Sequence, residues 1–291
     1  MHFRQPVTEI IRRRFSCRSY LNLPIEGQTR QLLADLAASL RVGPLGTPVR
    51  YMLIATTESD RRALRGLGTY GFVKNPMGFL VGAVKPGERS LEDYGYILEQ
   101  LVLYATDLGL GTCWLGGSFT RSRFARWIGA AEREDVPAIV AIGYMAARDN
   151  FRNEPLRRRL GAVNRLPWER LFFRCSFDQP LARAEAGAFA LPLEMVRLGP
   201  SASNKQPWRI VYEGNAWHFF LQRTPGYGDS LTFKLLRLAD IQRVDMGIAM
   251  CHFALTAREL GLSGHWLVED PAIARPDELT EYSVSWVESR I

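Results

Sequence analysis

The sequence predicts an α+β fold in which two similar halves follow one another along the chain. The first observation behind this prediction is a repeat: residues 93–115 align without a gap with residues 245–267, at an offset of 152 residues (245 minus 93). The second is the order of the predicted elements, because helix, strand, strand, helix, strand, strand recurs in both copies. A period of this length indicates a duplicated domain and not a solenoid of short repeats. A chain of 291 residues is long enough for two such units, each with a sizeable core.

The first predicted elements of each half are a helix, a loop and then a strand. In the first half the end of the helix, the loop and the strand lie in residues 40–54, and in the second half they lie in residues 196–212. The second of these strands continues into a hairpin over residues 210–221. Gly214 and Asn215 separate its two β-rich runs and can supply the positive φ angles of a tight turn.

The long repeated segment predicts an apolar helix followed by a strand in each half. Each helix ends at a Leu-Gly-Leu sequence, where Gly109 and Gly261 take the left-handed cap position. Each following strand is predicted to open with a Trp-Leu pair, at Trp114 and at Trp266. The strands predicted to close the two halves are residues 138–144 and 282–287.

The junction between the halves is predicted near the middle of the chain. The natural joining segments are residues 157–168 and 174–181. We therefore divide the chain into residues 1–173 and residues 174–291, and expect in each half a central antiparallel or mixed sheet with helices packed around it.

The charge pattern favours local anion sites over a nucleic-acid surface. A net charge of +7 and a pI near 9.4 suit a nucleic-acid surface, a pocket for an anionic cofactor, or neither. The basic residues cluster at 12–18 and at 152–165 and do not form one long stripe. Basic and aromatic residues are not interleaved, so a nucleic-acid-binding protein is the least favoured class.

Neither a membrane segment nor a secretory signal is predicted. No window approaches the run of about 20 apolar residues that a membrane-spanning helix needs. Residues 1–6 run into a basic amphipathic helix instead of the apolar run of a signal peptide. We therefore expect a soluble protein located in the cytoplasm.

Metal and hydrolytic chemistry have no support in the sequence. The cysteines are far apart and none has a histidine at metal-ligand spacing, so we expect reduced thiols and no metal site. Ser-His-Asp order, a His-Glu-x-x-His motif and a Gly-x-x-x-x-Gly-Lys-Ser loop are all missing, so hydrolase, metalloprotease and nucleotide-triphosphatase chemistry lack support. The four cysteines are Cys17, Cys113, Cys175 and Cys251.

Two segments almost two hundred residues apart predict the two sides of one anion-binding cofactor pocket. Residues 14–18 offer two guanidinium groups and a hydroxyl within five positions. Residues 199–208 form a loop of small side chains whose backbone N–H groups can approach a ligand closely. Taken singly, each has a simpler explanation, because arginines near a helix end suit its dipole and Pro-Ser-Ala-Ser-Asn is a turn. The hypothesis depends on the two segments occurring together.

These two segments and the glycine-rich residues 109–117 together resemble the FMN-dependent nitroreductase superfamily. The resemblance covers nearly the whole chain, and the duplication resembles a smaller branch in which two nitroreductase-like halves are fused in one chain. Members of the superfamily are usually homodimers with FMN sites at the subunit interface. The resemblance therefore implies a monomer that functions as a pseudo-dimer, with sheets flanked by helices in each half and FMN bound where the halves meet.

The resemblance also implies which residues contact the cofactor. The first segment would hold the phosphate and the pyrimidine edge of the flavin, Arg165 would be a second phosphate ligand, and residues 115–117 would pack against the ring. Residues 200–204 would arrive from the second half, as they do from the partner subunit in dimeric relatives. The residues implied to bind FMN are Arg14, Ser16, Arg18, Leu115, Gly116, Gly117, Arg165, Pro200, Ser201, Ala202, Ser203 and Asn204.

A second FMN site is not expected, so the prediction is one FMN per chain. The corresponding loop of the first half, residues 43–48, lacks the Ser-Ala-Ser-Asn donors. In a short alignment near the start of the second half, Asp178 takes the place of Arg18. A carboxylate at that place would repel a phosphate.

The function implied is an NAD(P)H-dependent FMN oxidoreductase that transfers hydride to a quinone, a nitroaromatic compound or another small acceptor. Reduced flavin carries negative charge near N1 and O2, so the guanidinium of Arg18 is predicted to act catalytically by favouring the reduced form. The alternatives are a flavin-binding protein without redox turnover, such as a carrier or sensor, and a specialised member that consumes the flavin. Neither nucleic acid nor a membrane is expected as a partner.

Overall fold

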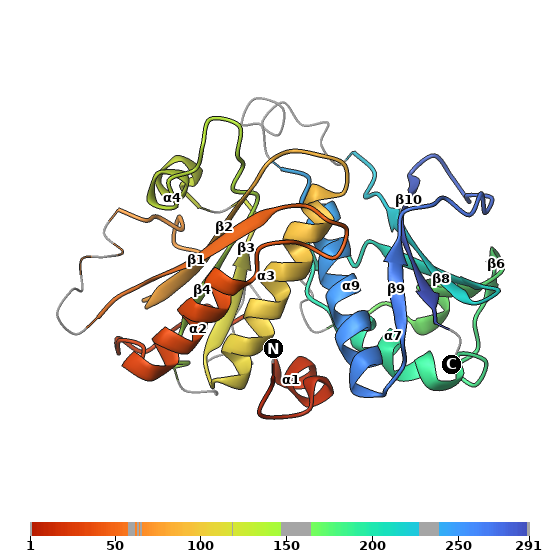
Figure 1. Ribbon diagram of the computed structural model, residues 1–291, viewed down its shortest axis with the longest axis horizontal. Helices are drawn as coiled ribbons and strands as arrows, with labels where there is room; N and C mark the ends of the chain where they lie inside the picture. Colours follow the sequence, from red (N-terminus) through yellow and green to blue (C-terminus); the bar gives the residue numbers. More distant parts are fainter. Residues whose placement is uncertain are drawn as a thin grey trace.

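Two long helices lie side by side between two β-sheets in the computed structural model of this protein (Figure 1). The structure describes residues 2–57, 62, 64, 66–117, 119–146, 164–226 and 239–289. The two central helices are α3 (Ser90–Asp107) and α9 (Ile241–Glu259), the two copies of the repeated apolar helix. The predicted α+β class is confirmed.

The first half of the chain forms a four-stranded antiparallel sheet. Its strand order is β1-β2-β4-β3, and helix α2 packs against β1. Besides α3, its elements are α1 (Val7–Arg13), α2 (Gly27–Ser39), β1 (Val49–Ala55), β2 (Gly78–Val84), β3 (Gly111–Leu115), α4 (Arg121–Trp127) and β4 (Ile139–Gly143).

The second half forms a six-stranded mixed sheet in the order β6-β5-β7-β8-β10-β9. All neighbouring strands are antiparallel except β5 and β7, which run parallel. Besides α9, its helices are α7 (Ala190–Arg197) and the short 3-10 turns η1 (Trp168–Arg170), η2 (Gly187–Phe189) and η3 (Ala202–Asn204). Its strands are β5 (Phe172–Arg174), β6 (Ser176–Pro180), β7 (Trp208–Glu213), β8 (Ala216–Gln222), β9 (Gly264–Leu267) and β10 (Thr280–Glu288).

The two sheets share one strand order, which confirms the fusion of two similar halves. The series β1-β2-β4-β3 of the first sheet corresponds to β7-β8-β10-β9 of the second. Along the chain, α3 lies between β2 and β3, and α9 lies in the equivalent place between β8 and β9. The predicted hairpin is present as β7 and β8, with Gly214 at φ +63° in its turn. The predicted closing strands are present as β4 and β10.

The end of each repeated helix is confirmed, and one detail of the following strand is corrected. Gly109 has φ +86° and Gly261 has φ +73°, the left-handed conformation that a helix cap requires. The Trp-Leu pairs at Trp114 and Trp266 lie at the ends of β3 and β9 and do not open them. Both strands begin earlier because pairing with β4 or β10 already starts at Gly111 and Gly264.

The predicted division between residues 173 and 174 runs through β5. This strand pairs with β7, so the chain has already joined the second sheet by Phe172. Strands β5 and β6 extend that sheet beyond the four strands that the halves share. The two-domain division itself stays a prediction, and the basic residues 152–159 lie outside the described part of the chain.

The helices α3 and α9 contact each other through equivalent positions. A Cβ atom on Gly95 would lie 2.2 Å from the carbonyl oxygen of Val244, and one on Gly247 would lie 2.0 Å from that of Glu92. Gly95 and Gly247 are 152 residues apart, and so are Glu92 and Val244. The contact is therefore two-fold-like, as at the interface of a symmetric dimer, and glycine is required at both places because the backbones are too close for a side chain.

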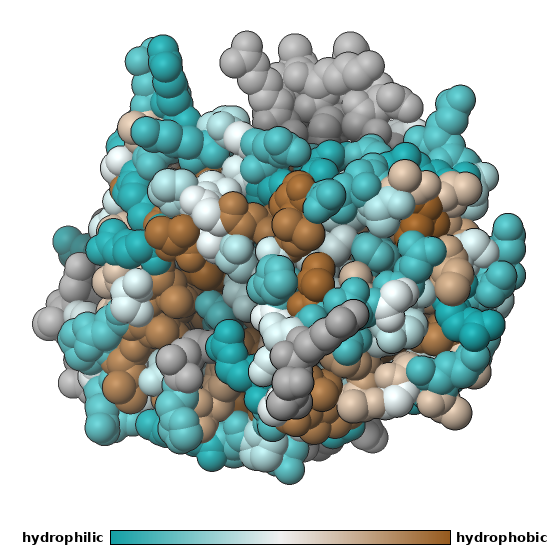
Figure 2. All heavy atoms as spheres, turned by 45° about the vertical axis from the view of Figure 1, so that its right-hand side comes forward, coloured by the Kyte–Doolittle hydropathy of each residue, from teal (hydrophilic) through white to brown (hydrophobic). Residues whose placement is uncertain are grey.

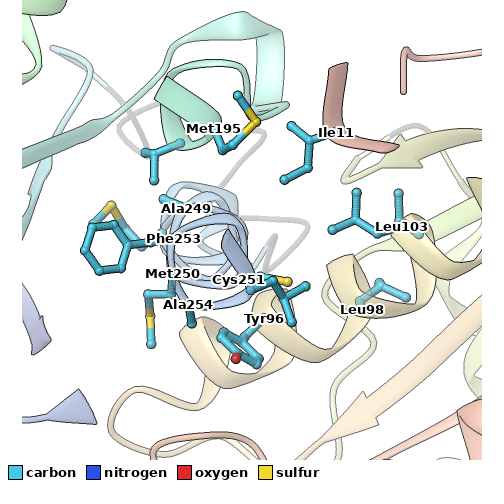
Figure 3. Close-up of a cluster of buried hydrophobic side chains, with 14 of the residues drawn as sticks. Ile11, Tyr96, Leu98, Leu103, Met195, Ala249, Met250, Cys251, Phe253 and Ala254 are labelled. Carbon is cyan, nitrogen blue, oxygen red and sulfur yellow. The ribbon is translucent and has the colours of Figure 1, made fainter. Parts of the chain in front are cut away.

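One hydrophobic core crosses from the first half to the second. Figure 3 shows Cys251 of α9 and Tyr96 of α3 where these helices face each other, with Met195 of α7 and Ile11 of α1 close to the same helices. All four side chains are buried. The two halves are therefore held together by burial of apolar surface, the main favourable term in folding.

The surface of the molecule is mixed in character. On the face shown in Figure 2, hydrophobic side chains lie in several groups with hydrophilic residues around and between them. Among the described residues, no helix is both long and apolar enough to cross a bilayer.

Candidate functional site

A cavity of about 500 Å³ opens where the two halves of the chain meet. It is lined by the segment that contains Ser16 and Arg18, by the end of β3 and the residues after it, by residues 200–203, and by the first turns of α9. Ligand sites of small molecules and cofactors have volumes of about 300 to 1,000 Å³. The cavity is therefore large enough for a cofactor.

The arginine-containing segment reaches the cavity because it runs alongside β3. Ser16 forms a parallel bridge with Thr112, and the backbone N–H of Cys17 donates to the carbonyl oxygen of Thr112 at 2.8 Å. On its other side, the N–H of Lys74 donates to the carbonyl oxygen of Arg18 at 2.7 Å. Arg18 is 8% exposed and lines the cavity, so its charge acts in a largely desolvated place.

Small residues after β3 leave room for α9 and for the cavity. A Cβ atom on Gly116 would lie 3.1 Å from the nearest side-chain atom of Ile241, the first residue of α9, so a larger side chain here would crowd that of Ile241. A Cβ atom on Gly117 would meet no atom within 4 Å. The backbone at residues 116–117 is therefore accessible to a planar ligand on one side.

The loop from the second half has an uncommon backbone conformation. Ser203, Asn204 and Gln206 all have positive φ angles, 49°, 56° and 50°, which cost free energy for residues other than glycine. Side chains of the loop hold this conformation: the N–H of Gln206 donates to the hydroxyl of Ser201 at 2.8 Å, and the N–H of Leu166 donates to the side-chain oxygen of Gln206 at 2.8 Å. Strain of this kind is concentrated at functional sites.

Asp245 ties the same loop to α9. Both of its carboxylate oxygens lie 3.1 Å from the N–H of Ala202, and the residue is 2% exposed and lines the cavity. Burial raises the pKa of Asp245 well above its ordinary value, against the hydrogen bond from Ala202, which lowers it. The carboxyl group therefore holds its proton to a higher pH than an exposed aspartate.

Comparison with family models matches residues 6–257 to the family described as "Putative TM nitroreductase". The chain belongs to this family. A comparison with curated proteins found no match.

Comparison with solved structures gives one match over almost the whole chain and others over about half of it. A "putative nitroreductase" from Thermotoga maritima is 21% identical, with a TM-score of 0.61, over 99% of this chain and 95% of that one. A "putative nitroreductase in complex with FMN" from Desulfovibrio desulfuricans is 22% identical, with a TM-score of 0.41, over 53% and 95%. A nitroreductase with bound FMN from Bacteroides fragilis is 21% identical, with a TM-score of 0.38, over 49% and 89%.

The cavity of this nitroreductase-family chain brings together nine of the twelve residues predicted to bind FMN. They come from both halves of the chain. They are Ser16, Arg18, Leu115, Gly116, Gly117, Pro200, Ser201, Ala202 and Ser203.

The other three predicted residues lie near the cavity without lining it. Arg165 donates to the side-chain oxygen of Asn204 at 3.1 Å and to the carbonyl oxygen of Leu198 at 3.1 Å, so it supports the loop. Arg14 is 9% exposed at the end of α1, where its backbone N–H donates to the carbonyl oxygen of Ile10 at 2.9 Å. Phosphate binding by Arg14 and Arg165 stays a prediction.

Sequence reasoning missed the contribution of α9. Its first turns line the cavity, and the available signal was the second copy of the repeat, which begins at Asp245 and follows the loop in the chain. The cavity-lining residues that were missed are Phe72, Cys113, Trp114, Ala138, Ala239, Ile241, Val244, Asp245 and Ile248.

The equivalent place on the other side of the molecule has different chemistry. An offset of 152 residues relates Ile241 to Arg89 and Gly116 to Val268, and both of these line a separate cavity of about 460 Å³. The carboxyl side chains that line it are Glu88, Asp270, Asp277, Glu278 and Glu281. Two arginines, Arg89 and Arg275, also line it, so carboxyl groups outnumber guanidinium groups and the surface disfavours a phosphate.

The proposed correspondence of Asp178 with Arg18 is wrong. Arg18 follows the segment beside β3, so its equivalent should lie beside β9. Asp178 lies instead on β6, at the opposite edge of the second sheet from β9. The alignment failed because β5 and β6 are additions to this sheet, with no counterpart in the first sheet.

The described part of the chain contains no group of three or more His, Cys, Asp or Glu side chains that could hold a metal ion. All four cysteines are free thiols. The polar side chains among the cavity-lining residues are those of Arg18, the three serines, Asp245, Cys113 and Trp114.

Proposed function

We propose that this protein is an NAD(P)H-dependent FMN oxidoreductase with one FMN site, in the cavity between its halves. One observation carries the proposal: Arg18 of the first half and residues 200–203 of the second half line the same cavity. Membership of the nitroreductase family supports it. Because one chain supplies both sides of the site, the proposed functional unit is a monomer acting as a pseudo-dimer.

The residues of the cavity fit the parts of FMN. Leu115, Ile241 and Ile248 offer apolar contacts for the ring system, and Arg18 with the hydroxyl of Ser16 offers polar contacts for its edge. When bound, FMN supplies the hydride-transfer chemistry, taking two electrons from NAD(P)H and passing them to a quinone, a nitroaromatic compound or another small acceptor. The protein would bind and orient it, and the guanidinium of Arg18 would favour negative charge on the bound flavin.

The test is the absorption spectrum of the freshly purified protein, with mass spectrometry of the molecule released on denaturation. We expect a flavin spectrum, release of FMN at one per chain, and oxidation of NADH or NADPH when a quinone or nitroaromatic acceptor is added. A colourless protein that takes up no added FMN would contradict the proposal. Bound FMN without oxidation of either nicotinamide would instead identify a flavin carrier or sensor.

The arginines should separate into two kinds. We expect Arg18→Ala to slow flavin reduction by NAD(P)H about 100-fold, as removal of a charge-stabilising donor does, with a smaller loss of FMN affinity. Arg14→Ala and Arg165→Ala should chiefly weaken FMN binding. Stopped-flow reduction and FMN titration measure the two effects, and Arg18→Lys is the control that keeps the charge. Equal losses of affinity in all three alanine variants, with unchanged reduction, would contradict this division.

A further inference from the structure

A chain of buried hydrogen bonds runs under the cavity from one half of the protein to the other. Nδ1 of His252 on α9 lies 2.8 Å from the carbonyl oxygen of Met195 on α7, and its Nε2 lies 3.0 Å from Oε1 of Glu99 on α3. The indole N–H of Trp114 donates to Oε2 of Glu99 at 2.7 Å. His252 and Glu99 are 0% exposed. The chain of bonds ends at Trp114, which lines the cavity.

The geometry fixes how many protons this chain holds. A carbonyl oxygen can only accept, so Nδ1 of His252 must carry a hydrogen. A hydrogen bond between Nε2 and Oε1 then needs one further proton, on the imidazole or on the carboxyl group. In both arrangements the pair is neutral overall and the oxygen facing Trp114 accepts. Every bond in the chain is therefore satisfied without a net buried charge.

The equivalent positions of the other half have no such chain. An offset of 152 residues relates Glu99 to Cys251, His252 to Gln100 and Trp114 to Trp266. In Figure 3 Cys251 lies in the apolar core where α9 faces α3. The indole nitrogen of Trp266 and the side-chain oxygen of Gln100 are buried, and neither has a hydrogen-bond partner within the described ranges.

This asymmetry points to a role at the cavity. A cysteine can occupy the position equivalent to Glu99 without burying a titratable pair, so the helix contact alone does not require Glu99 and His252. The pair is present only beneath the tryptophan that lines the cavity. Trp114 also directly precedes residues 115–117, which line the same cavity.

We infer that Glu99 and His252 are a positioning pair, one from each half, that fixes Trp114 and the end of β3 as one wall of the cofactor cavity. This inference rests on the proposed function, since the ligand of that cavity is taken to be FMN. The pair would make the shape of the site depend on the contact between the halves. A site held loosely by about 1 Å loses much of its activity or affinity.

The test compares two substitutions at one position. Glu99→Gln keeps all three bonds, because the amide oxygen accepts from Trp114 and the amide N–H donates to His252. Glu99→Leu removes the two bonds that residue 99 makes, to Trp114 and to His252. We expect Glu99→Leu to weaken FMN binding about tenfold or more and Glu99→Gln to stay within about twofold of the original protein. In protein labelled with ¹⁵N-tryptophan, the indole N–H of Trp114 should shift and exchange faster with solvent in Glu99→Leu only.

The other half supplies matched controls. Gln100→Leu and Trp266→Phe alter the equivalent residues. These residues do not line the cavity and take no part in the chain of hydrogen bonds, so the variants should leave FMN affinity unchanged. If Glu99→Leu does not fold, Trp114→Phe is the deciding variant, with a loss of FMN affinity expected for it and none for Trp266→Phe.

Three results would overturn the inference: unchanged FMN affinity in Glu99→Leu, equal losses in Glu99→Leu and Glu99→Gln, or equal losses in the two Trp→Phe variants. If the original protein takes up no FMN, the proposed function fails by itself. The indole N–H of Trp114 then tests the positioning pair. Slow exchange of this N–H with solvent in the original protein and in Glu99→Gln, with fast exchange in Glu99→Leu, would support the pair. Any other pattern would refute it.

Discussion

The two halves of this protein share one scaffold and differ in what their equivalent loops do. In the first half the N–H groups of Leu45 and Thr47 both donate to Asp93, at 2.8 Å each, so the loop is bound to α3. In the second half the N–H of Ala202 donates to the equivalent residue, Asp245, at 3.1 Å. The first loop is therefore held against α3 by Asp93, whereas the second loop lines a cavity.

The comparison shows which parts of a duplicated fold stay symmetric. The close glycine contacts between α3 and α9 are equivalent from both sides, because any change there acts on both halves at once. The loops, the carboxyl groups of the second cavity and the residues bonded to Trp114 differ from their equivalents at the offset of 152 residues, and they can do so without breaking the core. The proposed site is therefore asymmetric on a symmetric frame.

The largest effect should come from breaking the symmetric contact. Gly95→Ala and Gly247→Ala each place a methyl group 2.0 to 2.2 Å from a backbone oxygen of the facing helix. Neither backbone can move without shifting a whole helix, so we expect each variant to lose about 3 kcal/mol of unfolding free energy, at the upper end for overpacked cores. Urea unfolding measures the loss.

Gly27→Ala is the control for this prediction. It lies at the start of α2, where a Cβ atom would meet nothing within 4 Å, and should be neutral or slightly stabilising. A difference of more than about 1 kcal/mol between Gly95→Ala and Gly247→Ala would show that the contact is not symmetric in energy.

The sequence predicted the symmetric frame well and the asymmetric additions poorly. The gapless repeat contains the helices, the glycine caps and the strands that follow, because these depend on local patterns that survive duplication. Strands β5 and β6 were missed as additions to the second sheet, since three residues such as Phe172–Arg174 carry no strand period of their own.

The site was predictable in part for the same reason. Ser16, Arg18 and residues 200–203 carry recognisable side chains or turns, and the structure brings them to one cavity. In the sequence, Trp114 and Asp245 stand out only as parts of the repeat, because their place at the cavity depends on how the two halves pack together. No local pattern records a contact between segments more than one hundred residues apart.

The next effect in size separates the two equivalent carboxylates. Asp93→Ala leaves two N–H groups without an acceptor, so we expect a loss of about 2 kcal/mol in unfolding free energy and no change in FMN affinity. Asp245→Ala releases the loop that lines the cavity and should lower FMN affinity about tenfold, equivalent to about 1.4 kcal/mol. Urea unfolding and FMN titration of both variants test this. Loss of FMN affinity in both variants alike would contradict it.

Burial raises the pKa of both equivalent carboxylates, Asp93 and Asp245. The pKa of Asp245 in the folded state is raised well above its ordinary value of 3.8, chiefly by burial. Its contribution to stability is therefore fully present below about pH 4 and is lost as the pH rises through the folded-state pKa. Urea unfolding above pH 4 should show that the free energy of unfolding falls with pH in the original protein and falls less steeply in Asp245→Asn. An identical dependence on pH in the variant would show that Asp245 does not cause the fall.

The smallest effect concerns two arginines in equivalent places on β1 and β7. Arg50 forms an ion pair with Glu134 at 2.6 Å, whereas Arg209 donates to the carbonyl oxygens of Gln206 and Trp208, and burial lowers its pKa to about 10. The hydrogen bond from Arg50 lowers the pKa of Glu134 below its ordinary value of 4.5. The ion pair therefore stabilises the fold above that value, and this contribution is lost as the pH falls through the folded-state pKa.

Glu134→Gln should cost about 0.5 to 1 kcal/mol at pH 7, because the pair is partly exposed and screened. The difference from the original protein should shrink in 1 M salt and close as the pH falls below the depressed pKa of Glu134. The control is Glu213→Gln, which alters an exposed carboxyl group at the end of β7. It should leave stability unchanged both at pH 7 and below the pKa of Glu134. Arg50 also donates to the carbonyl oxygens of Ile128 at 2.6 Å and Gly129 at 2.8 Å. Equal stability of Glu134→Gln and the original protein at pH 7 in low salt would show that these carbonyl contacts hold β1 without the carboxylate, as carbonyl contacts of Arg209 hold β7.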